Sequence, residues 1–265
     1  MGLRRFHLFE FNDLTQAPES LRESVVETLS RTLRWGRILD GLVNPIEQFL
    51  SRAGTREVLD IGSGAGGPAT ILVDAFRERG QVPPHFRLTD LRPHLEAWAE
   101  ACATREQDID FVKTSVDATA IANDLAEGRA RTVVNMLHHL PPKLAQSVLL
   151  DGVRHGKGIF VAEAFERNPL RFLPIMMTSG RALLLNPIHT QRNRLAKIAL
   201  TWLTPIAALA GIWDGFVSAL RVYTEVELRH MVAPAGDDFE WTYGTFAYRF
   251  FGRGYFFYGT RRGKG

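Results

Sequence analysis

The 265-residue sequence contains one cysteine and no apolar segment long enough to cross a membrane. A single cysteine excludes an internal disulfide framework and any cysteine-rich zinc module, and it is typical of a reducing compartment. The longest uncharged run, Ile198 to Trp213, has 16 residues and contains Pro205, whereas a membrane-spanning helix needs about 20. The first residues, Met1 to Glu10, lack the apolar core of a secretory signal. These absences predict a cytoplasmic protein.

The overall composition is that of a globular protein. Lysine and arginine number 32 against 29 aspartate and glutamate, and apolar residues make up 45% of the chain. These proportions exclude a disordered, collagen-like or coiled-coil chain. The pI of about 9.2 is weak evidence for a nucleic-acid partner. The length favours one large domain, or one domain with a substantial insertion.

Short β-rich runs alternate with helical segments through the middle of the chain. Strands are predicted over Glu57–Ile61, Phe86–Thr89, Asp110–Lys113, Thr132–Met136 and Gly158–Ala162. Helices are predicted before them, over Leu21–Leu33 and Pro45–Arg52, and between them, over Ala69–Arg79, Leu95–Arg105, Ala120–Glu127 and Pro142–Val153. This alternation is typical of βαβ units in a mostly parallel sheet. Near the end, Phe239–Phe250 and Tyr255–Thr260 predict a closing hairpin around the turn Gly252–Gly254.

A glycine-rich loop follows the first strand and is the most informative motif. Gly62, Gly64 and Gly67 match the pattern G-x-G-x-x-G where a strand turns into a helix, and such glycines let a ligand approach the backbone. A P-loop is excluded, because no Gly-Lys-Ser/Thr follows. A dinucleotide site is disfavoured, since the next acid at a strand end, Asp90, comes 28 residues after Gly62 rather than about 20.

The order of motifs resembles a known family. The run Leu59 to Gly66 (LDIGSGAG) resembles the first motif of class I S-adenosylmethionine-dependent methyltransferases. Leu88–Leu91 (LTDL) is similar to the end of that family's second strand, Ser115–Ala118 (SVDA) to its third-strand turn, and Asn135–Leu140 (NMLHHL) to the fourth-strand end of its small-molecule members. The final hairpin resembles the one that carries the family's reversed seventh strand.

The resemblance implies S-adenosylmethionine as the cofactor and assigns residues to it. It implies that Asp90 binds the ribose hydroxyls and that Asp117 binds the adenine amino group between apolar neighbours. The full set of expected cofactor contacts is Asp60, Gly62, Ser63, Gly64, Gly66, Asp90, Leu91, Asp117, Ala118 and Asn135. The alternative for each acid is a helix cap or a solvated turn.

Two adjacent histidines are the candidates for acid–base chemistry. His138 and His139 follow the fourth strand, at the sheet edge where such folds bind ligands, and histidine accepts a proton near neutral pH. The alternative is that at least one of them packs or caps the next helix. Glu163 ends the next strand and faces the same edge, either as a functional group or as a hydrogen-bond partner. No His, Asp and Glu cluster has metal-ligand spacing, so no metal is predicted.

Other methyl-transfer chemistries lack their residues. The Asn-Pro-Pro-aromatic motif of adenine and glutamine N-methyltransferases would begin at Asn135 and is absent. Cytosine C5 methylation needs a cysteine in a loop after the fourth strand, but Cys102 lies on the predicted helix after the second strand.

The segment 168–223 interrupts the alternation and is predicted to be a helical insertion. It is apolar and broken by prolines, among them Pro169 and Pro187. From Arg167 to Trp213 there is no acid, whereas six residues are basic: Arg167, Arg171, Arg181, Arg192, Arg194 and Lys197. The resemblance implies that this insertion covers an acceptor pocket, while the plain alternative for most of its apolar residues is core packing. Asp214 and Arg221 are seven residues apart and therefore lie on one helical face. Three roles stay open for them: polar groups of the pocket, partners of each other through an intermediary, or solvated residues.

These observations predict an α/β, Rossmann-like fold. We expect a seven-stranded, mostly parallel sheet with an antiparallel last strand, a helical N-terminal lid (residues 1–54), and a methyltransferase domain (residues 55–265) that contains the insertion. The expected reaction is methyl transfer to a small, fairly apolar acceptor that is neutral or anionic, with His138, His139, Asp214 and Arg221 as the catalytic candidates. Three alternatives stay open: a peripheral membrane protein that methylates a lipid or quinone, an RNA-modifying methyltransferase, which the lack of an RNA-binding module disfavours, and a protein that binds the cofactor without catalysis. The sequence does not indicate an oligomeric state.

Overall fold

The computed structural model describes residues 4–11, 13–14, 16–168, 173–190, 192–249 and 251–262. The expected features at Pro169 and Arg171 lie outside these residues. The chain divides into two compact units. The helical unit comprises Met1–Ile38, Phe165–Val222 and Ala247–Arg253, and the sheet unit comprises Leu39–Ala164, Tyr223–Phe246 and Gly254–Gly265.

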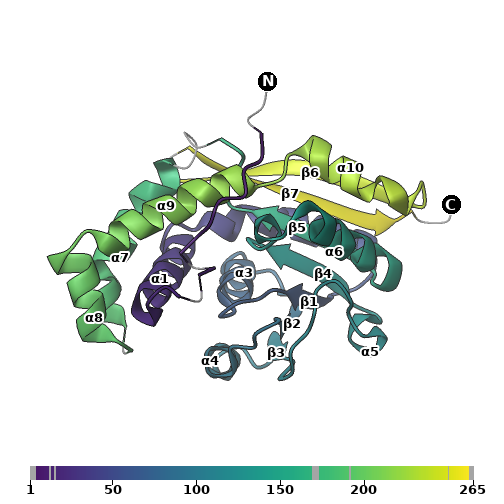
Figure 1. The fold of residues 1–265 in the computed structure, drawn as a ribbon. Coiled ribbons are helices and arrows are strands. Elements are labelled where there is room, and N and C mark those ends of the chain that lie inside the picture. Colours follow the sequence, from purple (N-terminus) through teal and green to yellow (C-terminus); the bar gives the residue numbers. More distant parts are fainter. Residues whose placement is uncertain are drawn as a thin grey trace. The chain divides into compact units, whose positions relative to one another are not determined.

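A seven-stranded sheet runs through the sheet unit (Figure 1). Its strands are β1 (Glu57–Ile61), β2 (His85–Thr89), β3 (Ile109–Phe111), β4 (Ala130–Val134), β5 (Gly158–Glu163), β6 (Phe239–Tyr248) and β7 (Gly252–Arg261). Their order is β3-β2-β1-β4-β5-β7-β6. Strands β1 to β5 pair in parallel, and β7 runs antiparallel to β5. The predicted mostly parallel sheet with an antiparallel last strand is therefore confirmed.

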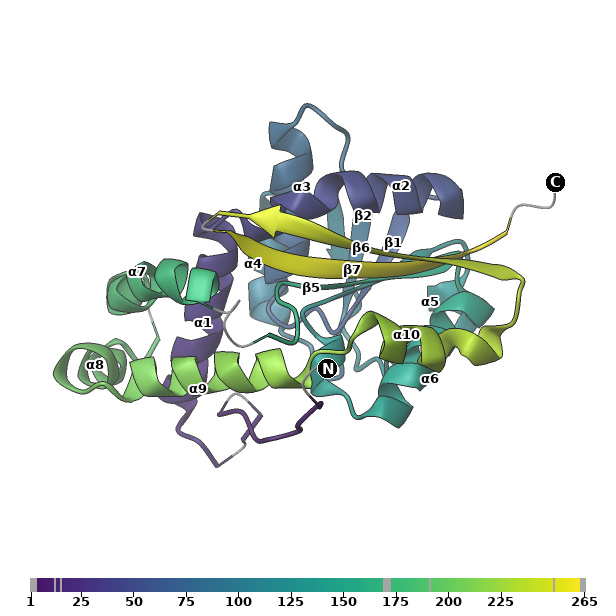
Figure 2. The ribbon, with the colours of Figure 1, turned by 90° about the horizontal axis from the view of Figure 1, so that it is seen from above.

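Helices cover both faces of this sheet. They are α2 (Val43–Ala53), α3 (Gly67–Glu78), α4 (Leu95–Ala103), α5 (Asn123–Ala126), α6 (Pro142–His155) and α10 (Glu225–Val232). Figure 2 shows α2 and α3 on one side of the sheet and α5, α6 and α10 on the other. Short helices lie between them: η1 (Ile38–Leu42), η2 (Leu137–His139) and η5 (Ala233–Ala235). Because both faces are covered, every residue of the central strands β4 and β5 is buried.

Aromatic packing fixes the sheet against α2. The ring of Phe49 on α2 lies 5.5 Å from that of Phe160 on β5 and 5.6 Å from that of Tyr258 on β7, between ring centroids. Such contacts add to the free energy of burial. They hold β5 in place, and therefore also Glu163 at its carboxyl end.

The helical unit is built from segments far apart in the sequence. It contains α1 (Glu19–Trp35), α7 (Leu173–His189), α8 (Arg194–Ile198), the π-helical turn η4 (Ala199–Leu203) and α9 (Ile206–Arg221). Helix α1 packs against α7, α8 and α9. The buried Lys197 of α8 joins it to α1, where its Nζ lies 2.9 Å from both Glu23 and Glu27. The insertion is helical as predicted, although Pro187 lies inside the last turn of α7 rather than ending it.

The closing hairpin differs from its prediction in the position of the turn. The glycines expected in the turn, Gly252 and Gly254, lie within β7, and the strand ends instead flank Phe251, which has a φ of 61°. A Cβ at Gly252 would overlap the ring of Tyr248, and one at Gly254 would overlap the Phe246 ring and the Glu163 carbonyl. These glycines therefore permit close approach across strands, a long-range requirement that the local sequence does not reveal.

Helix α10 was not predicted. Its N-terminus has a capping box, in which the Thr224 side chain accepts from the Glu227 N–H and the Glu227 carboxylate accepts from the Thr224 N–H. The pattern Thr-x-x-Glu was the available signal.

Candidate cofactor and active site

The loop between β1 and α3 is shaped by three glycines in the left-handed region. Gly62, Gly64 and Gly66 have φ values of 66°, 51° and 80°. Other residues pay a steric cost in this region, so the backbone itself requires glycine here. Gly66 is also the N-cap of α3, which places the loop at the amino end of that helix. Unpaired N–H groups at such an end favour a polar or anionic ligand group.

Two of these glycines have different surroundings. A Cβ at Gly62 would overlap the side chain of Met136, which packs against the loop. A Cβ at Gly64 would meet no atom of the described residues within 4 Å. The loop is thus closely packed on the side of Met136 and open at Gly64, which is where a ligand has room.

The acid after β2 holds this loop directly. Thr89 pairs with Ile61 in the parallel register, so Asp90 lies beside the glycines. One carboxylate oxygen of Asp90 accepts from the Gly64 N–H (2.9 Å), and the other accepts from the Arg92 N–H (2.8 Å). The structure therefore brings the predicted ribose acid to the predicted loop.

Asp60 is buried beneath the same loop. Its carboxylate accepts a hydrogen bond from the Thr132 hydroxyl (2.7 Å), and its carbonyl accepts from the hydroxyls of Ser63 (3.0 Å) and Thr89 (2.7 Å). Burial raises the pKa of Asp60 to about 6, and the nearby Asp90 carboxylate adds to that rise, whereas the hydrogen bonds oppose it. Asp60 and Ser63 thus brace the turn from inside.

The turn after β3 lies next to the end of β2. The Val116 N–H donates to the Asp90 carbonyl (2.9 Å), and the Ser115 hydroxyl donates to the Leu91 carbonyl (2.7 Å). Asp117 is exposed and accepts from the N–H and the hydroxyl of Thr119, which lower its pKa. The structure thus places Leu91, Asp117 and the half-buried Ala118 near Asp90.

Asn135 follows β4 in a left-handed conformation, with a φ of 54°. Its side-chain oxygen accepts from the Ala164 N–H (2.7 Å), and its own N–H donates to the Ala162 carbonyl (2.8 Å). Within the described residues, its buried Nδ2 has no hydrogen-bond partner. Because a buried amide without a partner is costly, this atom is a candidate ligand contact at the carboxyl edge of the sheet.

The buried histidine and the acid of the next strand form a pair. His138 lies in η2, and Glu163 ends β5. The ring Nδ1 of His138 lies 2.8 Å from one carboxylate oxygen of Glu163, and the backbone N–H of His138 donates to the other (3.1 Å). Burial raises the pKa of Glu163 to about 8, although hydrogen bonds from the N–H groups of His138 and Leu137 and the nearby His139 oppose the rise. The less buried ring of His139 packs against that of His138, with 4.1 Å between centroids.

The two polar candidates of the insertion hold the N-terminal segment. Arg221 lies 3.1 Å from the Glu10 carboxylate and 2.7 Å from that of Asp13. The Asp214 carboxylate accepts from the Phe11 N–H (2.7 Å). These contacts all lie within the helical unit and give both residues a positioning role there. Their contact with an acceptor stays a prediction.

Several residues that contact these groups were not predicted from the sequence. Thr132 faces Asp60 because the two pair in the β1–β4 register, so a strand alignment would have revealed it. Glu10 accepts from Ser218 (2.9 Å) and pairs with Arg221, but nothing near Glu10 in the sequence indicates these distant partners.

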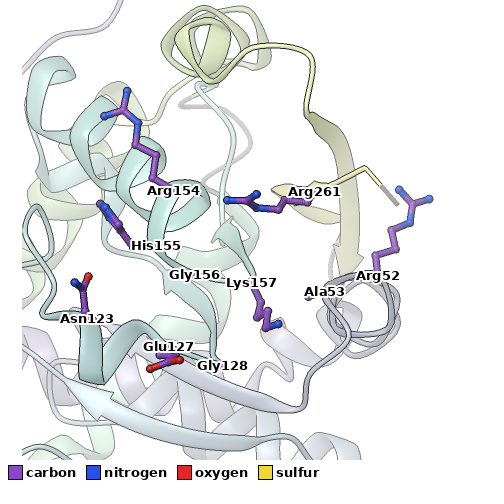
Figure 3. Close-up of a pocket in the computed structure, with 10 residues that line it drawn as sticks. All are labelled: Arg52, Ala53, Asn123, Glu127, Gly128, Arg154, His155, Gly156, Lys157 and Arg261. Atoms are coloured by element: carbon purple, nitrogen blue, oxygen red, sulfur yellow. The ribbon is translucent and has the colours of Figure 1, made fainter. Parts of the chain in front are cut away.

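A pocket of the sheet unit lies at the edge of the sheet opposite the glycine loop. It has a volume of about 670 Å³, and its lining includes Gly128 and Lys157, which come just before β4 and β5. Figure 3 shows Arg52, Arg154 and Lys157 pointing in different directions. The pocket is basic, but its cations do not converge, and it belongs to the amino edge rather than to the glycine loop.

No protein-family model and no curated protein matches the sequence. Solved structures do match. One is the O-methyltransferase NcsB1 from neocarzinostatin biosynthesis, with a TM-score of 0.52 and 13% identity over 92% of this chain and 59% of that one. Another is the pyocyanin biosynthetic protein PhzM, with a TM-score of 0.51 and 10% identity over 87% of this chain and 56% of that one. This chain has a methyltransferase fold. It spans less than two thirds of the length of either structure.

Proposed function

We propose that the protein transfers a methyl group from S-adenosylmethionine to a small, fairly apolar acceptor that is neutral or anionic. The observation that carries the proposal is the glycine loop tied to the acid of the next strand. Gly64 leaves room for a ligand, and its N–H is held by Asp90. The fold supports this reading, since such folds bind ligands at the carboxyl edge of the sheet.

The residues present fit that cofactor. The unpartnered Nδ2 of Asn135 offers a donor, and the open backbone at Gly64 offers space. The residues that would hold the cofactor are Asp60, Gly62, Ser63, Gly64, Gly66, Asp90, Leu91, Asp117, Ala118 and Asn135. When bound, S-adenosylmethionine supplies an electrophilic methyl group. NcsB1, which shares the fold, was crystallised with S-adenosylmethionine and with naphthoic acids, and this supports a small aromatic or similarly apolar acceptor.

The His138–Glu163 pair supplies a proton acceptor in this proposal. Glu163 orients the imidazole through Nδ1, and a carboxylate beside a histidine stabilises the charged ring once it gains a proton. Since burial raises the pKa of Glu163 to about 8, the pair holds an extra proton in most molecules at neutral pH. His138 accepts a proton from the acceptor in the fraction of molecules in which Glu163 is ionised. It becomes a better base as the pH rises toward that value. In this proposal the ring of His139 packs against the imidazole of His138, which accepts the proton.

The test is methyl transfer in a cell extract supplied with isotope-labelled S-adenosylmethionine and the purified protein. Mass spectrometry should find one small, apolar metabolite class that gains the label. His138→Ala should lower the rate by about 10²–10⁴-fold, the usual worth of a general base, and leave the affinity for S-adenosylhomocysteine unchanged. The proposal fails if no metabolite gains label while the folded protein binds the cofactor, because the protein would then be a cofactor-binding protein without catalysis.

The single cysteine also supports a cytoplasmic location, because it fits a reducing compartment. This part of the proposal is independent of the reaction.

A further inference from the structure

The helical unit exposes more large apolar residues than the sheet unit. Of the nineteen large apolar residues that are exposed in the described part of the chain, fourteen belong to the helical unit. Nine of them lie on α7, α8, η4 and α9, which are consecutive in the chain: Leu184, Ile188, Leu195, Trp202, Leu203, Ile206, Leu209, Ile212 and Phe216. Single exposed apolar residues need no explanation, but such a concentration marks an interaction surface.

Helix α9 is apolar on two faces. One face, with Ala207, Ala210 and Val217, is buried. The other carries Ile206, Leu209, Ile212 and Phe216, spaced three or four residues apart and therefore aligned in one stripe. Leu209 is 61% exposed. Packing within the helical unit explains the first face but not the second.

The exposed stripe borders an apolar groove of about 620 Å³. It is formed by the N-terminal segment, α1 and α9, and the described residues that line it are apolar: Phe9, Phe11, Leu21, Ile206, Leu209, Ala210, Ile212, Trp213 and Phe216. The Trp213 indole N–H donates to the Phe9 carbonyl (2.9 Å), and the Trp202 indole N–H donates to the Leu184 carbonyl (2.9 Å). With their polar atoms bonded, both indole rings present only apolar surface to an occupant.

The helices that carry this surface form a bent pair. No single helix in the described residues is long and apolar enough to cross a bilayer, but Arg194–Leu203 and Ile206–Arg221 meet that requirement together, with an 83° bend between them. At the bend, Leu203 is 77% exposed and Trp202 is 49% exposed. Such a bent apolar element suits shallow insertion into the interface of a membrane, where tryptophan is favoured.

The charge of this surface favours a membrane over a second copy of the chain as its binding partner. The segment from Arg167 to Trp213 contains no acid, and Arg181, Arg192 and Arg194 are exposed. Two acids of α1, Glu23 and Glu27, lie against this segment and pair with the buried Lys197, so they leave its exposed arginines in excess. In a symmetric dimer the same basic face would meet itself, which is unfavourable. An anionic phospholipid surface attracts it instead.

We propose that the surface formed by α7, α8, η4, α9 and Phe9, here called the apolar face, docks on an anionic phospholipid bilayer. The apolar side chains enter the interface, and the arginines contact the lipid phosphates. The docking goes beyond the proposed methyl transfer and does not depend on it.

The test is co-sedimentation of the full chain with vesicles of phosphatidylcholine, with or without phosphatidylglycerol. We expect binding to the anionic vesicles and little binding to the neutral ones. The variant Leu203→Ser/Leu209→Ser/Ile212→Ser should lower the partition coefficient by roughly tenfold or more. Arg192→Gln/Arg194→Gln should lower it by roughly fivefold for each charge removed.

The matched control removes exposed apolar residues from the sheet unit. Val82 and Val226 are 74% and 78% exposed, and Val82→Ser/Val226→Ser should bind vesicles like the wild type. Circular dichroism and the melting temperature check that each variant folds. Equal loss in the control and the triple variant would overturn the proposal, as would no binding of the wild type to anionic vesicles. A wild-type dimer that the triple variant dissociates, seen by light scattering without vesicle binding, would show that the apolar face binds a second copy and would also overturn it.

Discussion

At the scale of single residues, Asp90 makes the contact on which the cofactor assignment rests. Its carboxylate already accepts from Gly64 and Arg92, and it lies beside an open part of the loop. We predict that Asp90→Ala weakens the affinity for S-adenosylhomocysteine by about 1.5–3 kcal/mol, the worth of hydrogen bonds to a charged group. Asp117→Ala should cost less, because apolar neighbours such as the buried Val116 still support the adenine. Isothermal titration calorimetry measures both.

Asp110 is the matched control for Asp90. It lies on the neighbouring strand β3, and its carboxylate accepts from Arg87 at 2.9 Å. Asp110→Ala should leave the cofactor affinity unchanged. If Asp90→Ala binds as tightly as the wild type while folded, Asp90 is not the ribose acid.

The raised pKa of Glu163 predicts how the free energy of unfolding depends on pH. The unfolded chain loses this proton near the ordinary value of 4.5, whereas the folded protein keeps it up to about pH 8. The folded state therefore binds more protons between these values, so the free energy of unfolding falls as the pH rises through this window. We predict that Glu163→Gln, which stays uncharged, flattens this fall in urea denaturation experiments.

The buried Asp60 limits the pH range over which this measurement reports on Glu163 alone. Its pKa is raised from 3.8 to about 6, so it contributes a fall of the same sign that ends near pH 6. The comparison of wild type and Glu163→Gln is therefore made above about pH 6. Parallel curves for the two proteins up to about pH 8 would contradict the raised pKa of Glu163.

At the scale of elements, β7 depends on a glycine that packs against its neighbours. A Cβ at Gly254 would overlap the Glu163 carbonyl and the Phe246 ring. We predict that Gly254→Ala destabilises the protein by about 1–3 kcal/mol, as overpacking does. Gly211, within α9, has no atom of another described element within 4 Å of its ideal Cβ, and Gly211→Ala should be neutral or stabilising by up to about 1 kcal/mol, because alanine favours a helix. Urea denaturation of both variants checks the pair, and equal effects would contradict this account of β7.

Local signals predicted most of these elements, and long-range packing decided those that were missed. The glycine loop was predictable because strand, turn and helix follow one another within a few residues. The turn of the final hairpin was not predictable. Gly252 and Gly254 are needed for close packing against Tyr248, Phe246 and Glu163, not for a turn. The length of α5 was also overestimated, since it forms only Asn123–Ala126.

At the scale of the whole molecule, the sequence showed the parallel sheet, the reversed last strand and a helical insertion without acids. It did not show which apolar residues of that insertion lie on the surface. Leu209 and Ala210 are neighbours, yet one is 61% exposed and the other 3%. That difference follows from the packing of α9 in the helical unit, and the apolar face became visible only in the structure.

The central claim is that the sheet unit binds S-adenosylmethionine at its glycine loop, and the most direct test is calorimetry of the wild-type protein with two ligands. We predict micromolar binding of S-adenosylhomocysteine and no useful binding of NAD, because Asp60 and Asp90 lie at the glycine loop and Asp117 lies in the turn beside the end of β2. Asp90→Ala should weaken the first interaction. Binding of NAD without binding of S-adenosylhomocysteine would contradict the account.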